Sequence, residues 1–228
     1  MQYRLIGDTM PAVEVILNRG EGMYTQSGGM AWMTEGIEMT TSTRGGIGKG
    51  LIRSMFTGES MFMAQYTATR DNALVAFSAT VAGEIIPIDL AQHQGMILQK
   101  GAFLCATPGV QLEVTLTKRF SAGFFGGEGF VLQQAVGNGL LFIEIDGDRV
   151  EKNLAPGEVL YVDTGNVVAF DSSVSYDIEM IRGAKNIFFG GEGLFNTRLT
   201  GPGKVILQTQ NLKEYAGRIL SMMPRNNS

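Results

Sequence analysis

The sequence predicts an all-β protein assembled from three tandem copies of one unit of strands and turns. The 228-residue chain is 44% hydrophobic and contains 31 Gly but only 6 Pro, a composition typical of short apolar strands joined by tight turns. Apolar and polar residues alternate with a period of two in residues 112–118 and 176–180, as in strands that bury one face. A third observation, a motif that recurs along the chain, defines the repeat.

The recurring motif is Phe-x-Gly-Glu, and it sets the period of the repeat. The hexapeptide Phe-Phe-Gly-Gly-Glu-Gly occurs at residues 124–129 and again at 188–193, and a divergent copy occurs at 55–60. The Glu residues of the copies are 69 and 64 residues apart. Because a sequence repeated within one chain more often maintains a fold than a ligand site, we assign these positions a structural role. The positions are Phe56, Gly58, Glu59, Phe125, Gly127, Glu128, Phe189, Gly191 and Glu192.

Three β repeats and a helical tail follow from this period. Repeat 1 covers residues 1–84, repeat 2 covers 85–148, repeat 3 covers 149–210, and residues 211–228 form a C-terminal helix and tail. A single repeat of roughly 65 residues has a small core and exposed sheet edges, so we expect the repeats to pack in tandem and cover one another.

Turn sequences separate the expected strands. Residues 17–21 of repeat 1 correspond to residues 154–158 of repeat 3, and in both a further Gly follows eight residues after the Gly of the turn. The sequences Asn138-Gly139 and Asp146-Gly147-Asp148 predict β-hairpins, because Asn and Gly tolerate positive φ.

Only the C-terminal segment has helical periodicity. One face of this segment carries the apolar residues Leu212, Tyr215, Ala216 and Ile219. Asn211 precedes the segment as a helix cap and Pro224 follows its end. We expect this helix to cover an open sheet edge or to pack on a neighbouring molecule.

The net charge and the lack of recognisable targeting signals predict an ordinary soluble protein. The formal net charge of −4 gives no overall attraction to nucleic acid or to anionic membranes. The N-terminus lacks the basic start and apolar core of a signal peptide, and no uncharged apolar run reaches the ~18 residues of a transmembrane helix. We therefore expect a cytoplasmic protein without a transmembrane segment.

Histidine and cysteine are too few for most catalytic or metal sites. The chain has one Cys, Cys105, and one His, His93, whereas zinc sites need several such ligands. Cys105 lies in an apolar stretch and is expected to be a buried thiol, and His93 is expected to be a polar turn residue. No G-x-S-x-G nucleophile motif is present. The sequence thus predicts no catalytic residues, no metal, no cofactor and no enzymatic activity.

A basic residue lies ten positions before each motif Glu, and these residues give an alternative function. They are Lys49, Lys118 and Arg182, and the nearby bases are Arg44, Arg119 and Lys185. If the repeats place them at one level, they form a basic ring that binds RNA or another polyanion. The adjacent loop Gly45–Gly50 departs from the phosphate-loop pattern, because Gly50 follows Lys49 where Ser or Thr is required.

Trp32 and the methionines are interpreted as core residues. Trp32 aligns with residues 169–170 of repeat 3, which predicts a buried position. The 13 Met are expected to fill irregular gaps in the core, and the alternative is a Met-rich surface for a partner or for copper.

The chain resembles a known family. Residues 29–33, the loop 45–50 and the motif at 188–195 are similar to those of uncharacterised bacterial and archaeal proteins related to the mitochondrial "altered inheritance of mitochondria" biogenesis proteins. The resemblance implies three tandem domains like the tryptophan-responsive RNA-binding attenuation protein (TRAP-like), each a short double-stranded β-helix or sandwich, in a pseudo-three-fold arrangement. It further implies a homotrimer that closes a ring of nine domains. It carries over no catalytic residues.

The leading functional hypothesis is a non-enzymatic, ring-forming scaffold or binding protein. RNA or polyanion binding through the basic residues is the alternative. A membrane-associated organiser, as the mitochondrial relatives suggest, is a third hypothesis, although no basic amphipathic helix supports it.

Overall fold

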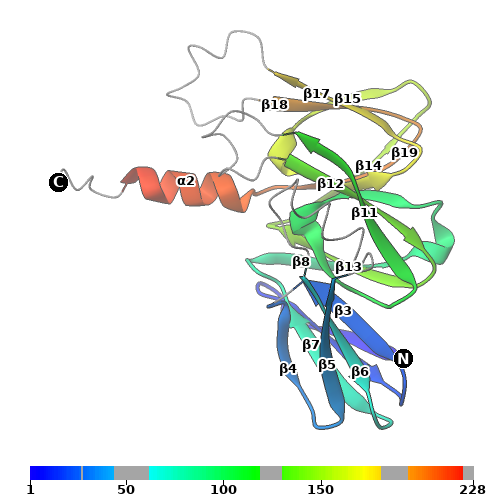
Figure 1. Ribbon diagram of the computed structural model, residues 1–228. Coiled ribbons are helices and arrows are strands. Elements are labelled where there is room, and N and C mark those ends of the chain that lie inside the picture. Colours follow the sequence, from blue (N-terminus) through cyan, green and yellow to red (C-terminus); the bar gives the residue numbers. More distant parts are fainter. Residues whose placement is uncertain (27, 44–61, 119–129, 181–194, 223–228) are drawn as a thin grey trace. The chain divides into compact units, whose positions relative to one another are not determined.

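The computed structural model describes residues 1–26, 28–43, 62–118, 130–180 and 195–222. These residues form β-strands, short 3₁₀ turns and one α-helix, which confirms the all-β prediction with a short C-terminal helix (Figure 1). The chain divides into two compact units. Unit 1 comprises residues 1–92, 103–111 and 137–144, and unit 2 comprises 93–102, 112–136 and 145–228.

Unit 1 contains two antiparallel sheets. Sheet A has the order β1-β2-β7-β4, with β1 (Gln2–Ile6), β2 (Ala12–Leu17), β7 (Ala73–Ser78) and β4 (Met30–Met33). Sheet B has the order β5-β6-β3-β10-β13-β8, with β5 (Ile37–Thr43), β6 (Phe62–Ala68), β3 (Gly22–Gln26), β10 (Phe103–Ala106), β13 (Leu140–Asp146) and β8 (Gly83–Asp89). The 3₁₀ turn η1 (Leu90–Gln92) follows β8.

The core of unit 1 lies between these sheets. Val15 of β2, Phe77 of β7 and Phe142 of β13 belong to one buried apolar cluster. Because side chains alternate along a strand, Glu14 and Ala76 point to the opposite face of sheet A. Sheet A therefore turns one apolar face to the core and carries the Glu14 carboxylate on the other.

Unit 2 also contains two antiparallel sheets. Sheet C has the order β11-β12-β9-β16-β19-β14, with β11 (Val110–Lys118), β12 (Phe130–Gly137), β9 (Met96–Gln99), β16 (Val167–Asp171), β19 (Gly203–Gln208) and β14 (Arg149–Leu154). Sheet D has the order β15-β18-β17, with β15 (Val159–Asp163), β18 (Phe195–Thr200) and β17 (Ser175–Met180). The remaining elements are η2 (Lys100–Ala102), η3 (Thr164–Asn166) and α2 (Leu212–Met222).

The core of unit 2 is likewise built from residues of both of its sheets. Leu132 and Phe170 from sheet C and Ile178 and Leu199 from sheet D belong to one buried cluster. The strands predicted at 112–118 and 176–180 are present as β11 and β17, so the period-two pattern is confirmed as strand.

One order of strands recurs along the chain. The order β2-β7-β4 in sheet A has the counterparts β8-β13-β10 in sheet B and β14-β19-β16 in sheet C. A second order, β5-β6-β3 in sheet B, has the counterparts β11-β12-β9 in sheet C and β17-β18-β15 in sheet D. Sheets B and C each contain one group of the first order and one group of the second. The two groups pair through β10 and β3 in sheet B and through β16 and β9 in sheet C.

The predicted boundaries at residues 84, 148 and 210 stay a prediction. The strands of the predicted middle repeat divide between the units, with β8, β10 and most of β13 in unit 1 and β9, most of β11 and most of β12 in unit 2.

The two predicted hairpins are wrong, although their turns are present. Gly139 and Gly147 have positive φ values of 149° and 74°, as the turn chemistry requires. However, β12 and β13 lie in different sheets, and β14 is not in the sheet of β13. A turn sequence fixes only the local reversal of the chain, so it does not determine whether the next strand pairs with the previous one.

The buried position predicted for Trp32 is also wrong. Trp32 is 41% exposed, whereas Cys105 is fully buried as predicted. Trp32 lies on β4, which forms an edge of sheet A, and Cys105 lies on the corresponding strand β10 in the interior of sheet B. The difference comes from the neighbouring strand that β10 has and β4 lacks among the described residues.

Candidate functional site

Most of the residues singled out in the sequence lie outside the described residues. Of the basic set, Arg44, Lys49, Arg119, Arg182 and Lys185 are outside, and β11 ends at Lys118, whose side chain is not described. All nine motif positions are outside as well, namely Phe56, Gly58, Glu59, Phe125, Gly127, Glu128, Phe189, Gly191 and Glu192. The basic ring and the structural role of the motif therefore stay predictions.

Two strand edges of the described chain carry exposed apolar side chains. Within the described ranges, β4 pairs only with β7 and β15 pairs only with β18. An open edge presents unpaired backbone N–H and C=O groups to any strand that approaches it. Apolar side chains accompany these groups, because Trp32 and Met33 on β4 and Val159 and Tyr161 on β15 are all exposed.

A buried carboxylate fixes the indole of Trp32 over sheet A. The register aligns Arg4 of β1, Glu14 of β2, Ala76 of β7 and Trp32 of β4 in one row across the sheet. Trp32 Nε1 donates to Glu14 Oε1 at 3.1 Å, and Arg4 Nε donates to Glu14 Oε2 at 2.6 Å. The indole reaches Glu14 over Ala76, whose small side chain leaves room for it. The hydrogen bond from Arg4 is the main cause that lowers the pKa of Glu14.

A tight turn sets the start of β15. Glu158 Oε2 accepts the backbone N–H of Ala155 at 2.8 Å, and Gly157 has a φ of 78°, which favours glycine. At the other end of β15, Asp163 Oδ1 accepts the N–H of Gly165 at 2.9 Å and so begins η3. A carboxylate thus holds the turn at each end of the strand, Glu158 before β15 and Asp163 at its last residue.

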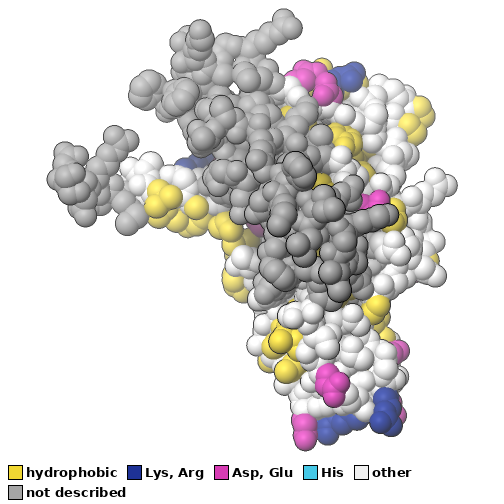
Figure 2. All heavy atoms as spheres, viewed as in Figure 1, with side chains coloured by type: hydrophobic (Ala, Val, Ile, Leu, Met, Phe, Trp, Pro, Cys, Tyr) yellow, Lys and Arg dark blue, Asp and Glu magenta, His cyan; other side chains and the backbone are white. Residues whose placement is uncertain are grey.

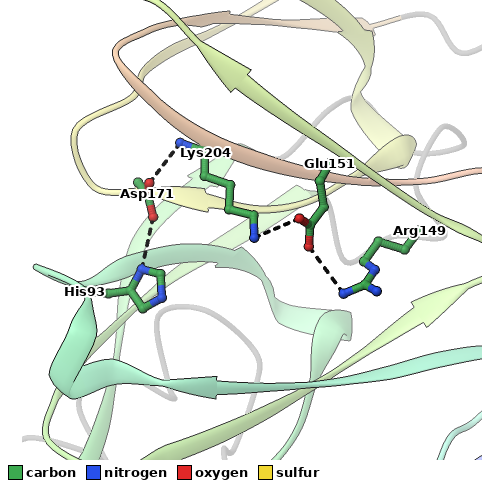
Figure 3. A network of polar contacts seen from close by, with 5 residues as sticks. All are labelled: His93, Arg149, Glu151, Asp171 and Lys204. Carbon is green, nitrogen blue, oxygen red and sulfur yellow. Dashed lines mark hydrogen bonds and ion pairs between the residues drawn. The ribbon is translucent and has the colours of Figure 1, made fainter.

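A charged network lies on sheet C (Figure 3). Asp171 Oδ2 accepts the backbone N–H of Lys204 at 2.8 Å, and its Oδ1 lies 3.3 Å from His93 Nδ1. Lys204 Nζ pairs with Glu151 at 2.8 Å, and Arg149 lies 3.3 Å from the same carboxylate. The contacts of Asp171 with His93 and Lys204, and of Lys204 with Glu151, tie β14, β16 and β19 to the segment after η1. His93 is indeed a polar residue in a bend.

Helix α2 turns its apolar face to solvent. The exposed large hydrophobic residues of this helix are Leu212, Tyr215, Ile219, Leu220 and Met222. Figure 2 shows hydrophobic side chains gathered along α2. An amphipathic helix normally buries such a face, so α2 has the surface of a helix that another element or molecule covers.

The N-terminus of α2 is attached to unit 2. The N–H of Leu212 donates to Asp146 Oδ2 at 2.8 Å, and the N–H of Tyr215 donates to the carbonyl of Asn211 at 3.0 Å. Burial raises the pKa of Asp146. Burial, and secondarily the charge of Asp163, also raises the pKa of Glu214.

Neither a membrane-spanning helix nor a metal site is present among the described residues. In those ranges no helix has the length and apolar character needed to cross a membrane. The same residues contain no group of three or more His, Cys, Asp or Glu side chains placed to hold a metal ion.

Comparison with known proteins identifies the family. A family model described as mitochondrial biogenesis AIM24 matches residues 3–210. The chain belongs to the AIM24 family. The family resemblance predicted from the sequence is therefore confirmed, and in this AIM24 protein α2 begins just beyond the matched residues.

Two relatives show how far the AIM24 similarity extends. An uncharacterised protein of Streptococcus pyogenes serotype M6 is 32% identical over 224 residues, which cover 96% of this chain and 89% of the relative. A Streptococcus pyogenes protein with a crystal structure from a structural genomics consortium is 27% identical, with a TM-score of 0.78 over 97% of this chain and 99% of the other. The AIM24 fold described above is thus shared along nearly the whole chain.

Proposed function

We propose that this AIM24 protein is a non-enzymatic scaffold that assembles with copies of itself into a closed ring. One observation carries the proposal. The strand orders recur along the chain, and among the described strands the series leaves an open edge at each of its ends, β4 at the first and β15 at the last. A tandem array of this kind can be extended only by a unit that offers the complementary edge.

Recurring side-chain contacts support three equivalent repeats. Thr34 Oγ1 accepts the N–H of Leu74 at 2.9 Å, and Thr107 Oγ1 accepts the N–H of Leu140 at 3.0 Å. At the equivalent place in the third group of strands, Asp171 accepts the backbone N–H of Lys204. These contacts support the pseudo-three-fold arrangement of three TRAP-like repeats, each a short double-stranded β-helix or sandwich, that the family resemblance implies.

The mode of assembly follows from the difference between the two ends. The open edges β4 and β15 are different surfaces, so a contact between them is head-to-tail. Head-to-tail contacts form a ring when the rotation between copies closes and a filament when it does not. The proposed closure is a homotrimer of nine repeats, in agreement with the family resemblance.

No catalytic role is assigned to the polar network in this proposal. His93, the only histidine of the chain, faces a carboxylate that also holds a backbone amide. This arrangement supports a structural role for the residue. Cytoplasmic location, polyanion binding and membrane association stay predictions.

Light scattering coupled to size-exclusion chromatography tests the assembly. Each chain has a mass of 24.6 kDa, and the proposal expects three times this mass over a range of protein concentrations. A closed ring gives one sharp species, whereas a filament gives a mass that grows with concentration. A species of 24.6 kDa at micromolar concentration contradicts the proposal.

A further inference from the structure

We infer that β4 of one copy pairs antiparallel with β15 of the next copy, with Trp32 opposite Val162 and Met33 opposite Tyr161. The inference rests on the proposed self-assembly and adds the surfaces and the register that would produce it. It is built from two junctions that the chain already contains.

The two internal junctions provide the template. At the first, β10 pairs with β3, with Cys105 opposite Thr25 and Ala106 opposite Tyr24. At the second, β16 pairs with β9 in the same antiparallel sense. There Ala169 lies opposite Leu98, and Phe170 lies opposite Ile97. Both junctions therefore join one strand of each recurring group in an equivalent way.

β4 corresponds to β10 and β16 residue by residue. Each of the three strands pairs with the central strand of its group, and each has an irregularity at the same place. The irregularities lie between Met30 and Trp32, Phe103 and Cys105, and Val167 and Ala169. Trp32 thus occupies the position of Cys105 and Ala169, and Met33 occupies that of Ala106 and Phe170.

β15 corresponds to β3 in the same way. Both strands follow the Gly-Glu turn that recurs in the sequence, and both contain five residues. Gly22 begins β3 opposite Thr67, and Val159 begins β15 opposite Thr200. Tyr161 therefore occupies the position of Tyr24. The next residue, Val162, occupies the position of Thr25.

Burial distinguishes the open edges from the junctions. Tyr24 is 1% exposed at the first junction, whereas Tyr161 at the equivalent position is 59% exposed. Cys105, Ala106, Ala169 and Phe170 are completely buried. By contrast, their counterparts Trp32 and Met33 are 41% and 42% exposed.

A second copy of the chain is the occupant that fits both edges. Each copy carries one β4 and one β15, so every edge that a new copy covers is replaced by an identical edge until a ring closes. Exposed apolar strand edges otherwise promote uncontrolled aggregation, and natural proteins cover them.

Disulfide trapping between variants that each carry one introduced cysteine tests the register. Chains with Met33→Cys are mixed with chains with Tyr161→Cys and oxidised, while the native Cys105 is buried and does not compete. We expect disulfide-linked dimers in the mixture and none in either variant alone. In the matched control, Met33→Cys is mixed with Leu160→Cys, whose thiol points to the opposite face of β15, so the expected dimer yield is about ten-fold lower.

A charged substitution on the edge provides the second measurement. Met33→Lys and Tyr161→Lys place a charge on β4 or β15, where it blocks strand pairing, and the residues are exposed, so the chain still folds. Met39→Lys on the edge strand β5 is the control, since Met39 is 54% exposed and outside the proposed contact.

The outcomes separate this inference from the proposed function. Assembly lost in both edge variants and kept in the control supports the inference. Assembly without the Met33–Tyr161 disulfide, or assembly that survives both edge charges, overturns the register and leaves the scaffold proposal standing. A wild-type chain that is monomeric overturns both.

Discussion

Glu21 and Glu158 make the same contact in two turns of the chain. Each carboxylate accepts the backbone N–H of the residue three positions earlier, from Asn18 and from Ala155, at 2.8 Å. The two turns lead into β3 and β15, which have very different surroundings, because β3 is an interior strand of sheet B and β15 is an edge of sheet D. The same local sequence therefore builds the same local structure, and the neighbours decide its exposure.

Removing the Glu158 carboxylate should destabilise unit 2 without changing the fold. Glu158→Ala leaves the N–H of Ala155 without its acceptor, and we expect a loss of about 1 kcal/mol in the free energy of unfolding. The measurement is chemical denaturation, with the exposed Glu179→Ala as the matched control. Equal stability of the two variants would show that the turn does not depend on this contact.

Acid should weaken the equivalent turn in unit 1 through Glu21. The backbone N–H of Asn18 is the main cause that lowers the pKa of Glu21, so this contribution is present above the unfolded value of about 4.3. It is lost as pH falls through the lower pKa of the folded state. Because Glu21 is partly exposed, we expect less than about 1 kcal/mol. Glu21→Gln should flatten the pH dependence of unfolding below pH ~5, and an unchanged profile would contradict the assignment.

Cys105 should be unreactive in the folded protein. It is completely buried, and burial, followed by the charge of Glu144, raises its thiol pKa well above the usual value. The thiolate is the reactive form, so a thiol reagent should label Cys105 only on unfolding. Stoichiometric labelling with and without denaturant measures this. Rapid labelling of the native protein would place Cys105 in a different environment.

Phe170 should be among the most costly residues to truncate. Its side chain is fully buried in the core of unit 2, and its ring centroid lies 5.3 Å from that of Tyr176. We expect Phe170→Ala to destabilise the fold by about 3–5 kcal/mol. Met10→Ala, at a residue that is 57% exposed, should change stability by less than about 0.5 kcal/mol. Thermal or denaturant unfolding compares them, and similar values would argue against the described core.

The charge of Glu214 should oppose the attachment of α2. Burial and the charge of Asp163 raise its pKa, so the cost is present above the raised pKa and is relieved as pH falls. Glu214→Gln should slow hydrogen exchange in α2 at pH 7, by an effect below about 1 kcal/mol because the group is partly exposed. In the wild type, lowering the pH should likewise raise the protection of α2, measured relative to the intrinsic exchange rate at each pH. The exposed Glu113→Gln is the control, and faster exchange in α2 of Glu214→Gln would contradict this account.

Local features were predictable from the sequence, and neighbour-dependent features were not. The turns at 17–21 and 154–158 and the helix begun by Asn211 depend on residues close in the chain, and the structure contains them. The exposure of Trp32 depends on whether a further strand pairs with β4, which no local pattern records. A tandem repeat nevertheless implies an unpaired edge at each end, and among the described strands β4 and β15 lie at these ends.

Glu14 should control the environment of Trp32, and the chain offers a direct readout because Trp32 is its only tryptophan. Glu14→Leu removes the acceptor of both the indole N–H and the Arg4 guanidinium, so we expect a shift of tryptophan emission to longer wavelength. Glu14→Gln keeps an acceptor oxygen for the indole and should shift it much less. Because Arg4 lowers the pKa of Glu14, the emission of the wild type should stay constant as pH falls through about 4.3, the ordinary value for Glu, and change only below it. Equal spectra for Glu14→Leu and the wild type would show that the carboxylate does not hold the ring.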